Sequence, residues 1–420
     1  MKLSVGRRGR LPREYGGTMT DMLVESVFDD SLHEMLRTGR EAGPSGTAAA
    51  SGAVVVLRYR EVESLAHDPR AAGVGLSIFD VLGVPEGPLR TWYSRLMFTN
   101  DGDAHHRLRR LAARVFTPRS VERHRELAAE LTADRLSDLV AAGGGDLVEL
   151  FADVPITVIC RLLGVPDDVV ADFVGYGDAL SPVFGLMDPD QIARAEVAVV
   201  DLMTDVERMI AARAGERGDD LISALLDAEE AGDRLTHDEV VTMVGNLIVG
   251  GHDTTSSQIG CSLLALLRNP DALEDVRSDP SITGAVVNET IRFEPSITIV
   301  PRTLTEQVTI GGVERPAGSL VFLSTASTSR DSEVWGDPDV FRPGRFLESG
   351  SPKLLAFGSG PHYCLGAALA RMTLEEVVRG SALAGLGDTI VPVRDLLGAD
   401  AVEWRQVLGR SPAALPVSVR

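Results

Sequence analysis

Cysteine is scarce in this sequence, with three among 420 residues. So few thiols cannot form the disulfide framework of a secreted protein, and we expect a protein of a reducing compartment, the cytoplasm. Cys160 and Cys261 lie in apolar helical runs and are interpreted as core residues. Long apolar runs are missing too. No segment approaches 20 consecutive apolar residues and the first 18 residues lack the apolar centre of a signal peptide, so we expect no membrane partner.

Positive charge is outnumbered by negative charge. The chain has 41 lysines and arginines against 61 aspartates and glutamates, a formal net charge of -20, which disfavours nucleic acid as a partner. Hydrophobic residues make up 44% of the chain, enough for a large core. No internal repeat, low-complexity tract or flexible linker is present. We therefore expect a loose tail at residues 1–20, followed by a single catalytic domain at residues 21–420 in a monomeric protein.

The third cysteine ends a glycine-rich loop, Phe357-Gly358-Ser359-Gly360-Pro361-His362-Tyr363-Cys364-Leu365-Gly366, and a helical pattern follows. Free N–H groups and the dipole at a helix start favour a thiolate. Gly358 and Gly360 permit backbone conformations closed to other residues, and Gly366 leaves room for a flat ligand. Because Phe357 can cover the sulfur, the loop predicts a soft anionic metal ligand in a dry pocket.

Two other interpretations of this loop were weighed. One is a buried structural cysteine beside an ordinary helix start. The other is a zinc site on His362 and Cys364, which is disfavoured because neither remaining cysteine belongs to a Cys-x-x-Cys pair.

The spacing F-G-x-G-x-H-x-C-x-G resembles the haem-binding signature of the cytochrome P-450 family. The resemblance implies that Cys364 is the axial ligand of the iron of haem b (iron protoporphyrin IX). It also assigns Phe357, Gly358, His362 and Gly366 to the haem-binding loop. The implied fold is mainly α-helical with smaller β-sheet regions, and the haem lies between a long central helix and the helix after the cysteine.

A basic helix is expected over residues 103–116, with His105 and Arg109 four residues apart on one face. Alone, this pattern also fits a solvated basic face. The resemblance assigns both residues to the haem propionates, together with Arg302, which is otherwise an ordinary surface arginine. By analogy, three further arginines form a cationic patch for an acidic electron donor: Arg107, Arg110 and Arg114.

The longest helical run covers residues 236–268 and begins with a capping signal, Thr236 and Glu239. It is apolar nearly all round, so it should cross the centre of the protein. Gly250-Gly251 and Asp253-Thr254-Thr255 are unusual there. They fit a kinked helix with satisfied polar groups, but G-G-H-D-T-T also resembles the oxygen-activation motif of the family, with Gly250 replacing the usual alanine. The resemblance implies that Asp253 and Thr254 guide protons and that Gly250 widens the pocket.

Glu289 and Arg292 stand three residues apart on a helix expected over residues 282–293, a spacing that permits an ion pair. Alone, the pair carries little information. In the family, such a pair forms a buried network with a later arginine, and Arg345 matches that third position.

The substrate pocket is expected to include several apolar segments. Residues 72–100 are predicted to form an irregular lid or pocket wall, and the segment 181–190 to join two helices over the substrate. Strands are expected at residues 53–58, within 298–328 and in the last 30 residues. The predicted pocket residues, besides Gly250, are Phe98, Phe184, Ile297, Thr298 and Ile299.

The resemblance implies a haem-thiolate monooxygenase that inserts one oxygen atom of O2 into a small or mid-sized apolar substrate, in bacterial secondary metabolism or catabolism. The chain has no dinucleotide fingerprint, and the resemblance implies a ferredoxin and its reductase as separate electron donors. Two alternatives stay open at this point. One is a different oxidation at the same iron, such as aromatic coupling or nitration, and the other is a non-catalytic haem-binding sensor, which would need no proton relay.

Overall fold

The computed structural model describes residues 31–47, 53–113, 116–184, 187–215, 217–218, 220–227, 236–396, 402–406 and 409–420. The tail predicted at residues 1–20 lies outside the described residues, as do Arg114 and the glycine at 185. That residues 21–420 form a single domain stays a prediction.

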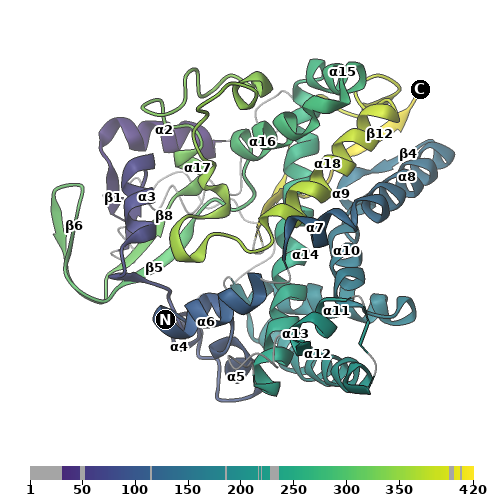
Figure 1. Ribbon diagram of the computed structural model, residues 1–420. Coiled ribbons are helices and arrows are strands. Elements are labelled where there is room, and N and C mark those ends of the chain that lie inside the picture. The colour runs from purple at the N-terminus through teal and green to yellow at the C-terminus, as the bar shows by residue number, and fades with distance from the viewer. Residues whose placement is uncertain are drawn as a thin grey trace.

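Helix α14 (His237–Arg268) runs through the middle of the molecule, as Figure 1 shows, and most of its residues are buried. Its start follows the predicted capping pattern. The hydroxyl of Thr236 accepts the backbone N–H of Glu239, and the Glu239 carboxylate accepts the N–H of Thr236 at 2.8 Å. The helix predicted for residues 236–268 is therefore confirmed.

Among the helices that pack against α14 are α10 (Val154–Leu163), α11 (Val170–Leu180), α12 (Pro189–Gly215), α16 (Thr283–Phe293) and α18 (Ala367–Leu383). They share one large apolar core with it. Cys160 on α10 and Cys261 on α14 are fully buried in that core, which confirms their interpretation as core residues. Burial raises the pKa of Cys160 to about 12.

The other described helices complete the helical part of the fold. Their bounds are α2 (Leu32–Ala42), α3 (Tyr59–His67), α4 (Ser77–Leu82), α5 (Pro88–Ser94), α6 (Gly102–Ala113), α7 (Pro118–Glu122), α8 (Arg125–Ala142), α9 (Leu147–Leu150), α13 (Leu221–Asp227), α15 (Asp271–Ser278) and α17 (Thr325–Thr328). Single 3₁₀ turns important for the site are η1 (Met97–Thr99), η3 (Ser181–Phe184), η6 (Pro343–Phe346), η7 (Leu355–Phe357) and η8 (Gly360–His362).

The expectation of an irregular segment at residues 72–100 is wrong, because α4, α5 and η1 lie within it. Pro88 begins α5, a position where its missing N–H and fixed φ suit a helix. Leu89, Trp92 and Tyr93 are then buried on one face of that helix. The helix is short and is held by this burial, which depends on the rest of the fold, so its local pattern was weak.

A five-stranded sheet lies beside α2 and α3, on the left in Figure 1. Its order is β1 (Ser45–Thr47), β2 (Val54–Val56), β8 (Leu320–Leu323), β5 (Val300–Leu304) and β3 (Ala71–Ala72). Only the β2–β8 pair is parallel, with Val55 opposite Phe322. This sheet confirms the strands predicted at residues 53–58 and near 300.

The remaining described strands form three small sheets. They comprise β4 (Gly144–Asp146), β12 (Pro416–Val419) and β9 (Ile390–Pro392), the pair β6 (Val308–Ile310) and β7 (Val313–Arg315), and the pair β10 (Trp404–Gln406) and β11 (Arg410–Pro412). The strands expected in the last 30 residues are confirmed. Residues 325–328 were predicted as β structure but form α17, because the Ser324 hydroxyl caps the N–H of Ser327.

Candidate functional site

The cysteine loop, residues 357–366, depends on two glycines with left-handed backbone. Gly358 has φ of +74° and Gly360 has φ of +69°. A Cβ on Gly360 would lie 2.2 Å from the carbonyl oxygen of Ala66 in α3. Because both the dihedral angle and the contact exclude a side chain, only glycine fits at position 360.

Cys364 ends this loop, and its side chain is exposed. Its backbone N–H donates to the carbonyl oxygen of Phe357 at 2.9 Å. Protein atoms around the sulfur raise the pKa of the Cys364 thiol, while the N–H of Gly366 and the charges of Arg109 and Arg371 oppose this. The N–H of Gly366 at the helix start thus favours the thiolate, as expected, but burial outweighs it and the net pKa shift is upward. A coordinated metal ion deprotonates a thiol by its own charge, so Cys364 is still a suitable ligand.

Two histidines stack beside the loop. The rings of His105 and His362 have centroids 4.1 Å apart, and His362 Nε2 lies 2.7 Å from Asp101 Oδ1. Burial acts to raise the pKa of Asp101, but His362 and the N–H of Gly73 outweigh it, so that pKa is lowered. Burial, His362 and Arg109 lower the pKa of His105 to about 4. Its Nδ1 has no hydrogen-bond partner in the described part of the chain.

Two arginines lie close to the same loop. Arg109, one turn after His105 on α6, donates from Nη2 to the carbonyl oxygen of Tyr363. Arg302 on β5 is 8% exposed, and within the described residues its guanidinium bonds only to the neighbouring Pro301 carbonyl, at 2.9 Å. Burial lowers the pKa of Arg302. Since a guanidinium has five N–H donors, most donors of Arg302 have no acceptor among the described residues.

This set of donors suits a flat metal-containing ligand with carboxylates. Arg302, Arg109 and the unpartnered Nδ1 of His105 are donors that bind carboxylate groups, and Cys364 offers the sulfur. A Cβ on Gly366 would meet no atom within 4 Å, so the space beside that position is open. Haem b has an iron ion and two propionates, and the residues therefore fit it.

Two adjacent glycines of α14 have different surroundings. A Cβ on Gly251 would lie 2.7 Å from Cδ1 of Ile159 on α10, so a larger residue there would have to displace the end of the Ile159 side chain. A Cβ on Gly250 would meet nothing within 4 Å. The Thr254 hydroxyl donates to the carbonyl oxygen of Gly250 at 2.9 Å. Residues four apart share a helix face, so the open space and the hydroxyl lie on the same side.

His252 and Asp253, which lie between Gly251 and Thr254, connect α14 to distant segments. Asp253 is 8% exposed, and its Oδ2 accepts the backbone N–H of Gly409 at 3.0 Å. His252 Nε2 lies 2.8 Å from Asp178 Oδ1 on α11, where Gly177 leaves room for the imidazole ring. Sequence reasoning missed both contacts. They join residues 156 and 74 positions apart, and no local pattern indicates such pairs.

The structure brings the three predicted network residues together. The Glu289 carboxylate accepts bonds from Arg292 at 2.7 and 2.8 Å and from Arg345 at 3.1 Å. The backbone N–H of Arg342 is a fourth donor, at 2.6 Å. The Glu289 and Arg292 side chains are fully buried, and that of Arg345 is 4% exposed. The network joins α16 to η6.

The predicted pocket residues fall into two groups. Phe98 on η1 and Phe184 on η3 have ring centroids 5.2 Å apart, so segments 86 residues apart in the sequence meet there. Ile297 is half-buried and Ile299 is 38% exposed. Thr298 is 2% exposed, and its hydroxyl has no partner among the described residues.

A cavity of about 420 Å³ reaches Cys364 from the side of α7, α8 and α18. Its lining includes Pro118, Arg125, Cys364, Leu365, Arg371 and Met372. No group of three or more His, Cys, Asp or Glu side chains among the described residues could hold a metal ion. No described helix has the length and apolar character to cross a membrane.

Comparison with known proteins agrees with this geometry. The family model for Cytochrome P450 matches residues 193–378. Cytochrome P450 107B1 of Saccharopolyspora erythraea is 36% identical over 414 residues, covering 96% of this chain and 98% of the relative. The 6-deoxyerythronolide B hydroxylase of the same organism is 33% identical over 402 residues, covering 92% and 96% of the two chains.

Among solved structures, the crystal structure of CalO2 matches with a TM-score of 0.85 and 25% identity, covering 94% of this chain and 98% of that one. The match confirms the predicted fold, mainly helical with small sheets. The chain belongs to the cytochrome P450 family, and it is a monooxygenase whose cofactor is haem b.

Proposed function

We propose that this monooxygenase hydroxylates or epoxidises an apolar organic molecule of small or middle size, using one oxygen atom of O2. The observation that carries the proposal is the pairing of two helices. The open Gly250–Thr254 segment lies on α14, the accessible Cys364 precedes α18, and the two helices pack together. The similar 6-deoxyerythronolide B hydroxylase supports a role in bacterial secondary metabolism or catabolism.

The sulfur of Cys364 would hold the haem iron, and His105, Arg109 and Arg302 would bind the propionates. When bound, the haem activates O2, and a thiolate ligand favours cleavage of the O–O bond. Phe357, Gly358, His362 and Gly366 would shape the loop against the ring. The unpartnered donors of Arg302 and His105 support this assignment, because buried donors usually have acceptors in a complete site.

Asp253 and Thr254 would guide protons into the pocket. Thr254 holds a proton at Oγ1 beside the open space at Gly250, where O2 would bind. The Asp253 carboxylate accepts the N–H of Gly409, so it must release that bond to turn toward Thr254. A carboxylate that alternates between two positions can pass one proton in each turn.

The substrate would lie between α14 and the segments that carry the two phenylalanines. Phe98 and Phe184 would form one wall, and Ile297 and Ile299 the other. Thr298 would also contribute, with its unpartnered hydroxyl as a polar point in an apolar wall. Gly250 would enlarge the space above the iron.

Electrons would come from a ferredoxin and its reductase, acting on a monomeric cytoplasmic enzyme. Of the cationic patch predicted from the sequence, Arg107 bonds to Glu239, and Arg114 lies outside the described residues. Exposed Arg110, Arg119 and Arg123 lie on or beside α6 and α7, near the cavity that reaches Cys364. They offer a positive surface for an acidic partner on a protein of net charge -20.

Turnover under ¹⁸O₂ tests the proposal. The haem-loaded enzyme would be incubated with ferredoxin, reductase, NADPH and a panel of apolar compounds that displace the water ligand of the iron. We expect a product that carries a single labelled oxygen atom. Oxidised products without label, or no oxidised product from any compound that binds, would contradict the proposal.

A further inference from the structure

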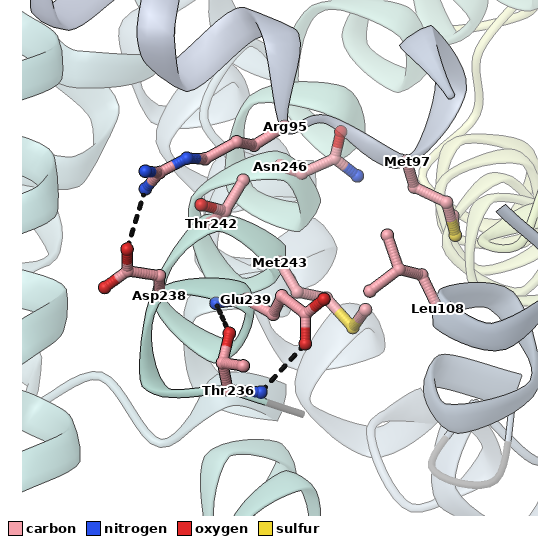
Figure 2. A pocket seen from close by; sticks show the side chains of 9 residues that line it. All are labelled: Arg95, Met97, Leu108, Thr236, Asp238, Glu239, Thr242, Met243 and Asn246. Atoms are coloured by element: carbon pink, nitrogen blue, oxygen red, sulfur yellow. Dashed lines mark hydrogen bonds and ion pairs between the residues drawn. The ribbon is translucent and has the colours of Figure 1, made fainter. Parts of the chain in front are cut away.

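Helix α14 makes polar contacts with other segments at two levels. At its first turn, Asp238 accepts a bond from Arg95 at 3.0 Å, in the wall of a cavity of about 280 Å³ (Figure 2). About four turns further on, the contact is made by the C-terminal part of the chain, where β11 packs against the helix. Gly409, the residue before β11, donates its N–H to Asp253 there. This second level therefore involves the carboxylate proposed to guide protons.

Gly409 lies very close to α14. A Cβ at this position would lie 2.7 Å from Cβ of Ser257, one turn after Asp253, and 3.5 Å from Cβ of Ser296. With the backbone this close to the helix, a shift of residue 409 moves its N–H relative to the carboxylate. Whatever holds Gly409 in place therefore also sets its bond to Asp253.

Arg410, the next residue, is 1% exposed and is anchored at several points. Its N–H donates to the carbonyl oxygen of Ser296 at 2.8 Å, and its own carbonyl oxygen accepts Cys261 Sγ at 3.2 Å. Its Nη1 donates to Glu294 Oε1 at 2.7 Å. The guanidinium also lies over the Trp404 ring of β10. Backbone and side chain of Arg410 thus tie the start of β11 to the segment after α16.

Glu294 is a charged partner for Arg410. It is 5% exposed, and its Oε1 also lies 2.9 Å from His33 Nε2. Burial acts to raise the pKa of Glu294, but His33, Arg410 and Arg330 outweigh it, so that pKa is lowered. The carboxylate is therefore ionised at neutral pH, and the contact with Arg410 is a buried ion pair.

The segment that carries Glu294 is itself bound to α14 through Gln258. The Nε2 of Gln258 donates to the Glu294 carbonyl oxygen at 3.1 Å, and its Oε1 accepts the N–H of Ser296 at 2.9 Å. The contacts therefore form a closed ring. It leaves α14 at Gln258, passes through the segment after α16 and the start of β11, and returns to α14 at Asp253.

We propose that Arg410 is a positioning residue for the oxidation, and that its ion pair holds the Gly409 N–H against the Asp253 carboxylate. The inference rests on the proton-guiding role proposed for Asp253. A fixed N–H gives the carboxylate one defined resting position, from which it turns toward Thr254 and to which it returns. Without the anchor this position is lost, and proton transfer loses the alignment on which its rate depends.

Hydrogen exchange of the haem-loaded protein, resolved to single amides by mass spectrometry, tests the positioning directly. In Arg410→Met the amide of Gly409 should exchange about fivefold faster, the effect of one net hydrogen bond. The double variant Arg410→Met/Glu294→Gln removes both charges of the pair, so no buried anion loses its partner, and should show the same increase. Thermal unfolding checks that each variant is folded.

Arg330→Met is the matched control. Arg330 is also a buried arginine beside Glu294. Its hydrogen bonds run to Asp339 and to the carbonyl oxygen of Phe293, not to the start of β11. This variant removes the same charge from the same surroundings, and the exchange of the Gly409 amide should not change.

A double-mutant cycle then separates positioning from a purely structural role. Turnover is measured with ferredoxin, reductase, NADPH and the compound that gives labelled product. Arg410→Met should lower product formation about tenfold, with peroxide in its place, and leave the dissociation constant of the compound unchanged. In an Asp253→Asn background the same substitution should have no further effect, because Arg410 acts through that carboxylate.

Three results would overturn the inference: unchanged exchange at Gly409 in both Arg410 variants, an equal increase in Arg330→Met, or equal losses of product in the two backgrounds of the cycle. Failure of the proposed oxidation is seen separately, as the absence of labelled product from the unsubstituted enzyme. The exchange measurement needs no turnover, so it decides in either case whether Arg410 holds the Gly409 N–H.

Discussion

The Thr254 hydroxyl donates a hydrogen bond to the carbonyl oxygen of Gly250 at 2.9 Å. This bond is internal to α14, so the proton of the hydroxyl is held on the helix until another acceptor replaces Gly250. The side of the helix that carries both residues is open at Gly250. The pair is therefore a place where a proton can be held beside an empty volume without a buried charge.

Replacing Thr254 by alanine should leave haem and substrate binding intact and uncouple the reaction. Without a hydroxyl to deliver the proton, we expect product formation to fall about 10²-fold while reducing equivalents appear as hydrogen peroxide. NADPH consumption, product and peroxide are measured together. Thr204→Ala removes a similar helical bond, 2.8 Å to Val200, on the exposed face of α12 and should not alter the coupling. Unchanged coupling in the Thr254 variant would refute its role.

Cys364→His should bind haem but lose the red-shifted band that the reduced enzyme with carbon monoxide owes to thiolate ligation. The imidazole replaces the sulfur as a neutral ligand, which removes the electron donation that shifts the band. A difference spectrum of the reduced, CO-treated protein measures it. Cys261→Ser, a change at a buried cysteine of α14, should keep the band. If the Cys364 variant retained it, another residue would be the ligand.

Glu289→Gln should lower the free energy of unfolding by about 3–5 kcal/mol, because two buried arginines would lose their only shared anion. Urea denaturation measures the change. Glu274→Gln breaks an exposed pair with Arg277 on α15 and should cost less than about 1 kcal/mol. Equal stabilities of the two variants would show that the buried network does not hold the loops near the haem.

Stability should fall as the pH drops from about 6.5 to about 4, because the His33 side chain, 16% exposed, lies largely out of solvent beside cations. Burial and Arg330, assisted by Arg410, lower the pKa of His33 to about 4 against the attraction of Glu294. Between pH 6.5 and about 4, His33 binds a proton in the unfolded chain but stays neutral in the folded chain. The stability that its neutral form contributes above pH 6.5 is therefore lost on acidification.

The contribution of His33 amounts to about 3 kcal/mol over this window. Urea denaturation at pH 6.5, 5.5 and 4.5 measures it. His33→Gln keeps a polar partner for Glu294 without a proton to gain, so its stability should depend less on pH. Parallel pH profiles of the variant and the unsubstituted protein would contradict the assignment to His33.

Local sequence patterns were sufficient to predict a structural feature wherever that feature depends on neighbours along the chain. The capping of Thr236 by Glu239, the helix over residues 236–268 and the bond from Thr254 to Gly250 all lie within four residues, where helix geometry sets the spacing. The glycines of the cysteine loop could also be predicted from the sequence, as far as their backbone angles are concerned. Their left-handed angles are local, and residue type alone indicates them.

Tertiary structure decided the contacts between distant segments. The Asp101–His362 pair joins residues 261 positions apart, and the Ala66 carbonyl explains why Gly360 admits no side chain. The lack of a partner for the Thr298 hydroxyl and the net upward shift of the Cys364 pKa also depend on what packs around these residues. The sequence by itself determined the family, the ligand loop and the central helix, because each is indicated by residues that lie a few positions apart along the chain. Only the fold decided which polar groups remain unpaired, because burial and pairing are properties of surroundings assembled from the whole chain.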